Sequence, residues 1–202
     1  MNAKAIGGII VVLVVVIAVY FVFFSQNQEQ ELTFSEGVKQ INGLWEKNKV
    51  NSAYLSSSDS ELKFSSSDLD ALSDDLIEFK NSLNDLKKTE DVEALKDFTE
   101  IHLLLVDELK LALELKEKND FLGEITGDNL CLNKTDLMFV GEKTIELNNK
   151  MAQVNELVYA FNELHSGFEE QANLASFIVD ASNFSQTKLE NELALQELER
   201  LC

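Results

Sequence analysis

Two histidines and two cysteines are the residues of this chain best suited to chemistry. His102 and His165 both fall on or beside an apolar helical seam, where helical bundles hold metals or haem. Di-iron bundles use Glu-x-x-His pairs, but Thr99 and Asn162 stand three residues before the two histidines. A zinc site would need all four residues, and neither CxxC nor His-x₃-His spacing is present. We interpret each histidine as a buried, hydrogen-bonded core residue, with a haem held by both as the alternative, and predict no metal or cofactor.

Motifs of enzymes are missing from the sequence. It has no G-x-S-x-G, P-loop, G-x-G-x-x-G or H-E-x-x-H pattern. The acid pairs Asp74-Asp75 and Glu169-Glu170 stand at polar helical positions, where charge usually serves solvation. Residues 123–129 contain oxygen ligands but not the spacing of a calcium loop. The sequence therefore predicts a protein that is not an enzyme.

The two cysteines occupy positions that a helical hairpin would bring together. If the chain folds back at Ser166-Gly167, a residue n lies opposite about residue 333 minus n, so Cys131 meets Cys202. A disulfide between them would close a loop of about 70 residues and contribute on the order of 4 kcal/mol. Such bonds persist outside the cytoplasm. We predict this disulfide; two unrelated thiols are the alternative.

An apolar segment near the N-terminus has the length of a membrane span. Ala5 to Phe24 is a run without charged or strongly polar side chains, and as a helix it would cover about 30 Å. A cleaved signal peptide, the alternative, has a shorter apolar core and small residues at its end, where this run has Tyr20 to Phe24. The sequence predicts a membrane anchor in residues 1–24, with residues 5–24 in the lipid bilayer.

The charges beside the anchor indicate its orientation. Lys4 and the α-amino group precede the run, whereas Glu29 and Glu31 follow it. The positive-inside rule then places the N-terminus in the cytoplasm and the domain behind it outside. A pilin-like leader cleaved after Gly8 fits less well, because Leu13 replaces the usual glutamate. We predict a single-pass cell-membrane protein with a polar juxtamembrane linker, residues 25–31, and an extracytoplasmic domain, residues 32–202.

The composition of the domain is acidic and helical. The whole chain has 36 acidic and 17 basic residues, a formal charge of −19, and no proline. Phosphate backbones would repel such a protein, so nucleic acid is not a predicted partner. Most of the acids are interpreted as a solvated surface.

Apolar residues repeat at three- and four-residue spacing along most of the domain. The periodicity predicts one helix from near Leu32 and a second whose N-cap is Ser67 or Asp68. A third runs from about Glu90 to Lys118, with its second half heavily buried. A turn is predicted at residues 87–91, with a kinked continuous helix as the alternative. A fourth helix from about Asn133 and a fifth ending at Cys202 meet at the predicted hairpin. The predicted fold is all-α: one N-terminal transmembrane helix, then an elongated antiparallel bundle of about five helices.

The function predicted from these features is an interaction or scaffold module. Amphipathic seams favour helix-on-helix contact, with a protein partner or through self-association. Trp45 and Phe64 are candidate partner contacts, and core packing is the alternative for Trp45. A small-solute-binding sensory domain acting through a separate membrane partner is the alternative function. Asn133 and Asn183 are the first residues of two N-glycosylation sequence patterns. The patterns alone do not establish whether either asparagine is modified.

Overall fold

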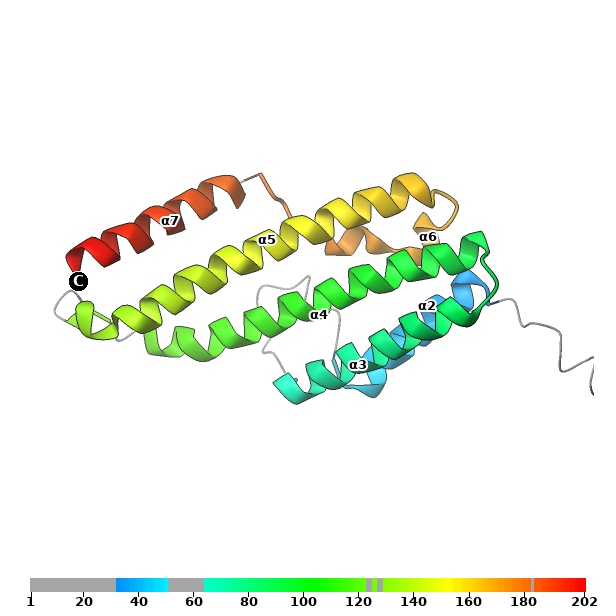
Figure 1. Cartoon of the computed structure of the whole chain (residues 1–202), viewed down its shortest axis with the longest axis horizontal. Coiled ribbons are helices and arrows are strands. Elements are labelled where there is room, and N and C mark those ends of the chain that lie inside the picture. Colours follow the sequence, from blue (N-terminus) through cyan, green and yellow to red (C-terminus); the bar gives the residue numbers. More distant parts are fainter. Residues whose placement is uncertain (1–31, 51–63, 123–124, 127–128, 183) are drawn as a thin grey trace, which may run out of the picture. The chain divides into compact units, whose positions relative to one another are not determined.

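The described part of the chain is entirely helical. The structure, a computed structural model, describes residues 32–50, 64–122, 125–126, 129–182 and 184–202. Thr33–Cys202 forms one compact unit (Figure 1). Its elements are α2 (Phe34–Lys47), α3 (Ser66–Ser82), η2 (Leu83–Asp85), α4 (Glu90–Leu122), η4 (Cys131–Asn133), α5 (Lys134–Leu164), α6 (Glu169–Ala172), η5 (Leu174–Phe177) and α7 (Phe184–Leu201). The all-α prediction is confirmed for these residues, with the one-turn α6 added to the five predicted helices.

The predicted anchor and linker, residues 1–31, lie outside the described residues. Among the helices that the structure does describe, none combines the length and the apolar character needed to cross a bilayer.

Side-chain caps explain where the helices begin. Thr33 and Glu36 form a capping box at the start of α2. Ser65 and Asp68 form the same box before α3, so the predicted cap at Ser67 or Asp68 is wrong. Asp68 is the third helical residue, whose carboxylate reaches back to the cap. Thr89 Oγ1 accepts a hydrogen bond from the Val92 amide, and four non-helical residues, 86–89, precede α4, so the predicted turn is confirmed over the kink.

Ion pairs and hydrogen bonds involving side chains show the direction of each helix that neighbours α4. Lys110 pairs with Asp70, and Lys80 pairs with Glu100, so α3 runs antiparallel to α4. On α2, by contrast, the Phe34 amide donates to Asp91 and Trp45 donates to His102, so α2 runs parallel to α4. Four side-chain pairs described below make α5 antiparallel to α4, and α7 lies along α5 on the other side (Figure 1).

Burial along α4 ends where its neighbour α3 begins. Leu105, Leu109 and Leu111 are buried, as predicted, whereas Leu113 and Leu115 are only partly covered. Lys110 already lies opposite Asp70, in the first turns of α3, so the rest of α4 extends past that helix. The predicted heavy burial therefore holds only as far as Leu111.

The chain after α5 is not the single helix that the sequence predicts. The break at Ser166-Gly167 is confirmed, but α6, η5 and non-helical residues precede α7. Asn173 has a φ of 47°, a left-handed conformation that ends α6. The hairpin register is nevertheless preserved, because the Asn155 side chain bonds to both backbone groups of Val179, and these two numbers sum to 334.

Candidate functional site

His102 is buried between α2 and η5 and is neutral. Its Nδ1 accepts a hydrogen bond from Trp45 Nε1 at 3.1 Å, which places the ring proton on Nε2. Its side chain is 3% exposed, and this burial lowers the pKa of His102 to about 3. Among the described residues, Nε2 has no hydrogen-bond partner. Phe177 packs edge-on to the ring at 5.8 Å between centroids.

His165 follows the last residue of α5 and has a different environment. Its Nε2 lies 2.9 Å from Asp97 Oδ2, on α4. Its amide donates to the Phe161 carbonyl, closing the last turn of α5. Nδ1 is buried and unpartnered within the part of the chain that is described. Both histidines are thus core residues as predicted, but each is hydrogen-bonded through one ring nitrogen only.

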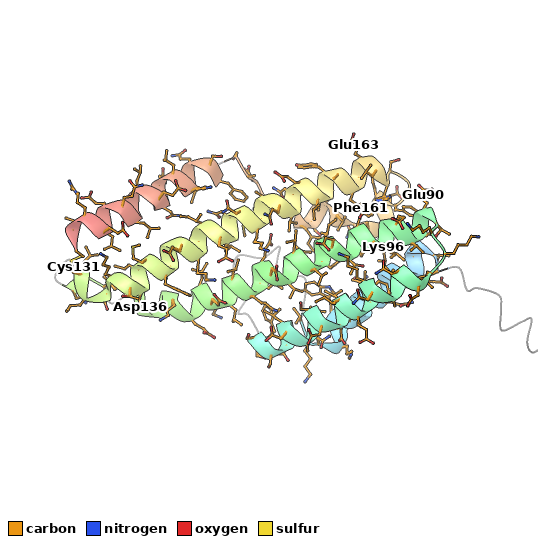
Figure 2. The ribbon with its side chains drawn as sticks, in the orientation of Figure 1. Glu90, Lys96, Cys131, Asp136, Phe161 and Glu163 are labelled. Carbon is orange, nitrogen blue, oxygen red and sulfur yellow. A yellow bond between two sulfur atoms is a disulfide. The ribbon has the colours of Figure 1, made fainter. Side chains whose placement is uncertain are left out.

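An aromatic cluster separates the two histidines. Phe98 packs 4.5 Å from the His102 ring and 6.1 Å from Phe161, whose ring lies 5.0 Å from His165. Phe34 from α2 contacts both phenylalanines. Figure 2 shows Phe161 on α5 turned toward α4. The cluster joins α2, α4 and α5, and it fills with phenyl rings the space between the histidines.

The two predicted partner contacts are interior side chains. Trp45 is 4% exposed and Phe64 is 6% exposed. The hydrogen bond from Trp45 to His102 gives its indole N–H a buried partner, which favours the core-packing alternative. Neither side chain reaches the surface of the described domain, so contact with a partner must be sought elsewhere.

Glu108 is a buried acid that the sequence analysis overlooks. Its side chain, on α4, is 5% exposed, and no described residue bonds to Oε1. Burial raises the pKa of Glu108 to about 7, although the charge of Lys150 acts in the opposite direction. One feature of the sequence points to Glu108: it interrupts the apolar stretch from Ile101 to Leu115. In such a stretch, charged side chains would be expected on only one face of the helix.

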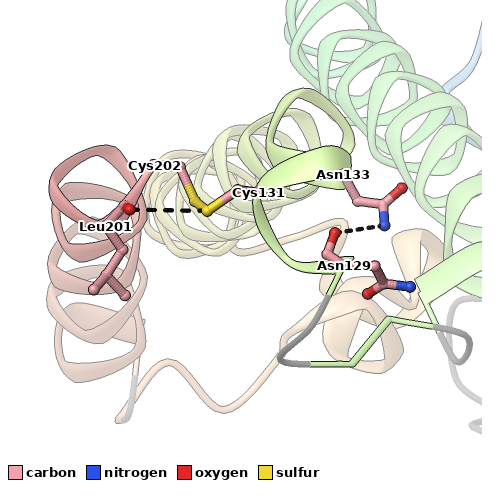
Figure 3. The surroundings of a disulfide bond; sticks show 5 residues. All are labelled: Asn129, Cys131, Asn133, Leu201 and Cys202. Atoms are coloured by element: carbon pink, nitrogen blue, oxygen red, sulfur yellow. Dashed lines mark hydrogen bonds between the residues drawn. A yellow bond between two sulfur atoms is a disulfide. The ribbon is translucent and has the colours of Figure 1, made fainter.

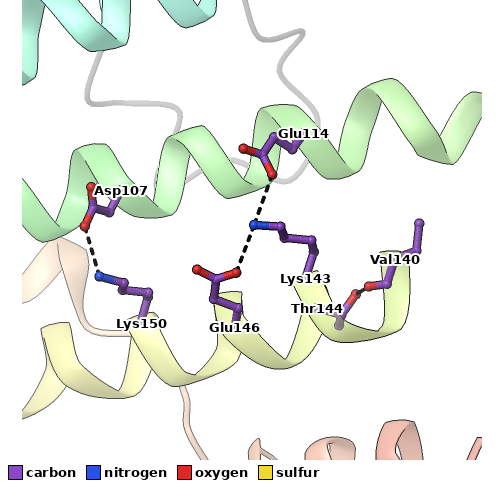
Figure 4. A network of polar contacts seen from close by, with 7 residues as sticks. All are labelled: Asp107, Glu114, Val140, Lys143, Thr144, Glu146 and Lys150. Atoms are coloured by element: carbon purple, nitrogen blue, oxygen red, sulfur yellow. Dashed lines mark hydrogen bonds and ion pairs between the residues drawn. The ribbon is translucent and has the colours of Figure 1, made fainter. Parts of the chain in front are cut away.

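Lysines tie α5 to α4 along their length (Figure 4). Lys150 bonds to Asp107 at 2.9 Å, and Lys143 bridges Glu114 at 3.3 Å and Glu146 at 3.0 Å. Further along, Lys118 pairs with Asp136. These groups are partly exposed, so each pair contributes about 0–1 kcal/mol. Their role is to set the register of α4 against α5.

Cys131 and Cys202 form a disulfide, as the sequence predicts (Figure 3). Their Cα atoms are 5.2 Å apart, across a sequence separation of 71. The Cys131 sulfur lies 3.8 Å from the carbonyl oxygen of Leu201. Both cysteines are exposed. Nearby, Asn133 donates to the Asn129 carbonyl, while Asn183 lies outside the described residues.

Four large exposed apolar side chains lie beside Cys131 or along α7. We define the leucine face by these four, each at least 55% exposed: Leu132, Leu189, Leu193 and Leu201. Leu132 and Leu201 are the sequence neighbours of the two cysteines, and Leu189 and Leu193 lie one turn apart on α7. Scattered exposed leucines are common, whereas a group of them marks a contact surface.

Comparison of the chain with known protein families, curated proteins and solved structures finds no match. Within the described ranges, no three or more His, Cys, Asp and Glu side chains gather where they would hold a metal ion.

Proposed function

We propose that this chain is a single-pass, membrane-anchored interaction module whose helical domain lies outside the cytoplasm and binds a protein partner through the leucine face. The exposure of four leucines, one beside Cys131 and three along α7, carries the proposal. Burial of such side chains against a partner helix is worth about 1.5–3 kcal/mol each. The apolar run from Ala5 to Phe24 supports the anchor, and the disulfide supports an oxidising compartment.

A pair of matched double variants tests the contact surface. Leu189→Gln with Leu193→Gln removes the two leucines of the leucine face that lie one turn apart on α7, and Ile77→Gln with Leu164→Gln replaces exposed apolar side chains elsewhere. Full-length proteins are recovered from native membranes, and co-purifying proteins are quantified by mass spectrometry. We expect the recovery of at least one co-purifying protein to fall about tenfold with the first double variant and to be unchanged with the second. Equal recovery with both variants would contradict the proposal.

The proposed location of the domain outside the cytoplasm is tested by whether the two cysteines are disulfide-bonded in the native membrane. Free thiols are blocked at lysis, and peptides are analysed without reduction. A Cys131–Cys202 cross-link in most molecules is the expected result, because disulfides persist outside the cytoplasm. Two blocked, free thiols would contradict the extracytoplasmic orientation.

A small-solute-binding sensory domain is the second candidate. The observation that favours it is the pair of buried polar atoms on α4, His102 Nε2 and Glu108 Oε1, that lack partners among the described residues. A solute that hydrogen-bonds to either atom would stabilise the domain. Thermal unfolding in the presence of a small-molecule library tests this alternative, and an unchanged melting temperature throughout would remove its support.

A further inference from the structure

Helix α7 buries much less of itself than α2, although it is longer. Of the α7 side chains, all of which the structure describes, only Leu198 is buried. Helix α2 buries Phe34, Gly37, Ile41 and Trp45. The main packing neighbour of α7 is α5 (Figure 1). Apolar burial therefore contributes little to the docking of α7.

The seam between α5 and α7 also contains polar groups that docking does not satisfy. Gly141, Asn148 and Asn155 are spaced by seven residues and share the α5 face that meets the returning chain. A Cβ on Gly141 would lie 2.6 Å from Leu195 Cδ2, and Asn155 bonds to Val179.

Helical phase places Asn148, between Gly141 and Asn155 on α5, and Asn191 on α7 toward this seam. Asn191 lies one turn before Leu195, on the same face of α7. Both amide nitrogens are buried, and neither has a partner in the described part of the chain. Burying an unpaired amide opposes docking. The seam by itself thus holds α7 weakly.

Two connections at opposite ends compensate for this weak seam. At one end, the Asn155 amide donates to the Val179 carbonyl at 2.7 Å and its oxygen accepts from the Val179 amide at 3.0 Å. At the other end, beyond the whole length of α7, stands the Cys131–Cys202 disulfide. The aromatic cluster of α2, α4 and α5 includes no residue of α7. Nothing in that cluster would have to move if α7 left α5.

We infer that the disulfide is a redox-controlled latch: α7 is docked on α5 while the bond is intact and leaves α5 when the bond is reduced, whereas α2 to α5 stay folded. A dithiol reductant breaks the sulfur–sulfur bond through a mixed disulfide. It supplies two electrons and two protons, is itself oxidised to a disulfide, and leaves the Cys131 and Cys202 thiols. Both cysteines are exposed, which gives the reductant access. This inference goes beyond the proposed function and requires no partner.

The expected size of the effect follows from the length of the closed loop. The bond joins residues 71 apart in the sequence. Because α5 stays folded when α7 leaves, only the part of this loop after Val179 gains freedom, and the chain-entropy model gives on the order of a few hundredfold in an equilibrium constant for a segment of that length. The α5–α7 seam is partly polar, so apolar burial does little to offset the loss of the disulfide. Leu198 is the only buried side chain that α7 contributes.

Hydrogen–deuterium exchange of the full-length chain in detergent tests the latch. The oxidised protein is compared with a Cys131→Ser, Cys202→Ser variant. We expect α7 peptides to exchange at least about a hundredfold faster in the variant, and peptides from residues 94–106 and 154–161 to keep their protection. Unchanged protection of α7 would overturn the latch, because the seam alone would then hold the helix. Loss of protection throughout would also overturn it, because the bond would then support the whole domain.

A second pair of variants tests the cause of the weak seam. In the cysteine-free background, Asn148→Leu with Asn191→Leu replaces the two unpaired amides with apolar side chains. We expect α7 to recover at least about tenfold of its protection, since burial of apolar groups now favours docking. Asn149→Leu with Gln196→Leu introduces leucines at exposed positions on the same two helices and should restore nothing. Equal exchange of α7 in both pairs would show that the buried amides do not weaken the seam.

Discussion

The two ends of this domain are held together by different means. At the aromatic end, which comprises α2, α3, α6, residues 90–111 of α4, residues 154–164 of α5 and His165, side chains from several helices bury one another. At the disulfide end, which comprises residues 112–122 of α4, residues 131–151 and α7, Leu198 is the one buried apolar side chain among those described. The disulfide lies at the end with the smaller core.

The difference arises from the number of helices that overlap. Four long helices share the aromatic end, whereas α2 and α3 do not extend alongside the second half of α4. Apolar side chains there have fewer neighbours, although α4 and α5 remain rich in leucine and phenylalanine. A covalent bond compensates where a hydrophobic core is small, as in many small secreted domains.

The same substitution at the two ends should give the largest contrast. Phe98→Ala removes a ring that contacts Phe34, His102 and Phe161, and we expect it to lower the free energy of unfolding by about 3–5 kcal/mol. Phe139 on α5 is only partly buried, and Phe139→Ala should cost about 1–2 kcal/mol. Urea unfolding of the oxidised proteins measures both. Equal losses would show that the two ends are equally packed.

Glu108 gives a prediction with a defined pH dependence. Its pKa rises from 4.5 in the unfolded chain to about 7 in the folded one, so the folded state binds the extra proton between these values. Stability from this group is therefore complete below about pH 4.5 and is lost as the pH rises through about 7. Glu108→Gln should stabilise the domain by up to about 3 kcal/mol at pH 8 and by much less at pH 5.

Chemical unfolding at both pH values tests this expectation, with Glu117→Gln as the control. Glu117 is an exposed glutamate on the same helix, and its substitution should change little at either pH. His102 acts in the opposite direction: its pKa falls from 6.5 to about 3, so it lowers stability as the pH falls from about 6.5 toward 3. A pH-independent effect of Glu108→Gln would show that the carboxyl is charged in the folded state.

Local sequence signals were sufficient for most of the helices and for the cysteine pair, but not for the cap of α3 or the irregular segment between α5 and α7. The turn before Glu90 and the three-four seams each depend on residues within one or two turns. The pairing of Cys131 with Cys202 needed only the position of the break at Ser166-Gly167. It survived the irregular return segment because Val179 still lies opposite Asn155.

The extent of burial could not be read from the same signals, because it depends on which distant segments overlap. Leu111 and Leu113 look alike in the sequence, yet only Leu111 is buried. Likewise, nothing local identifies Leu193 as exposed, and the one local sign of the burial of Glu108 is its place inside an apolar stretch. Sequence alone therefore does not reveal the leucine face, and it favours Trp45 and Phe64 as contacts only through their aromatic character, although both are buried. The types of side chain predict the helical periodicity, whereas tertiary packing determines which side chains are exposed at the surface.

Three glycines allow the packing of the two ends to be compared by adding one methyl group at a time, as Gly→Ala substitutions. A Cβ on Gly37 would overlap the side chain of the fully buried Leu95, whereas nothing lies within 4 Å of one on Gly43. We expect Gly37→Ala to cost about 1–3 kcal/mol and Gly43→Ala, in the same helix, to stabilise by about 1 kcal/mol. Circular dichroism melting of the purified proteins distinguishes these outcomes.

Gly141 places the same test at the disulfide end. Its Cβ would meet Leu195 of α7 at 2.6 Å, but α7 buries little and is able to shift. The gain in helix propensity, about 1 kcal/mol, should then offset most of the overlap, leaving a net change within about 0.5 kcal/mol. A loss as large as that of Gly37→Ala would mean that the α5–α7 seam is as rigid as the aromatic end. In that case the disulfide would reinforce a helix that packing already holds.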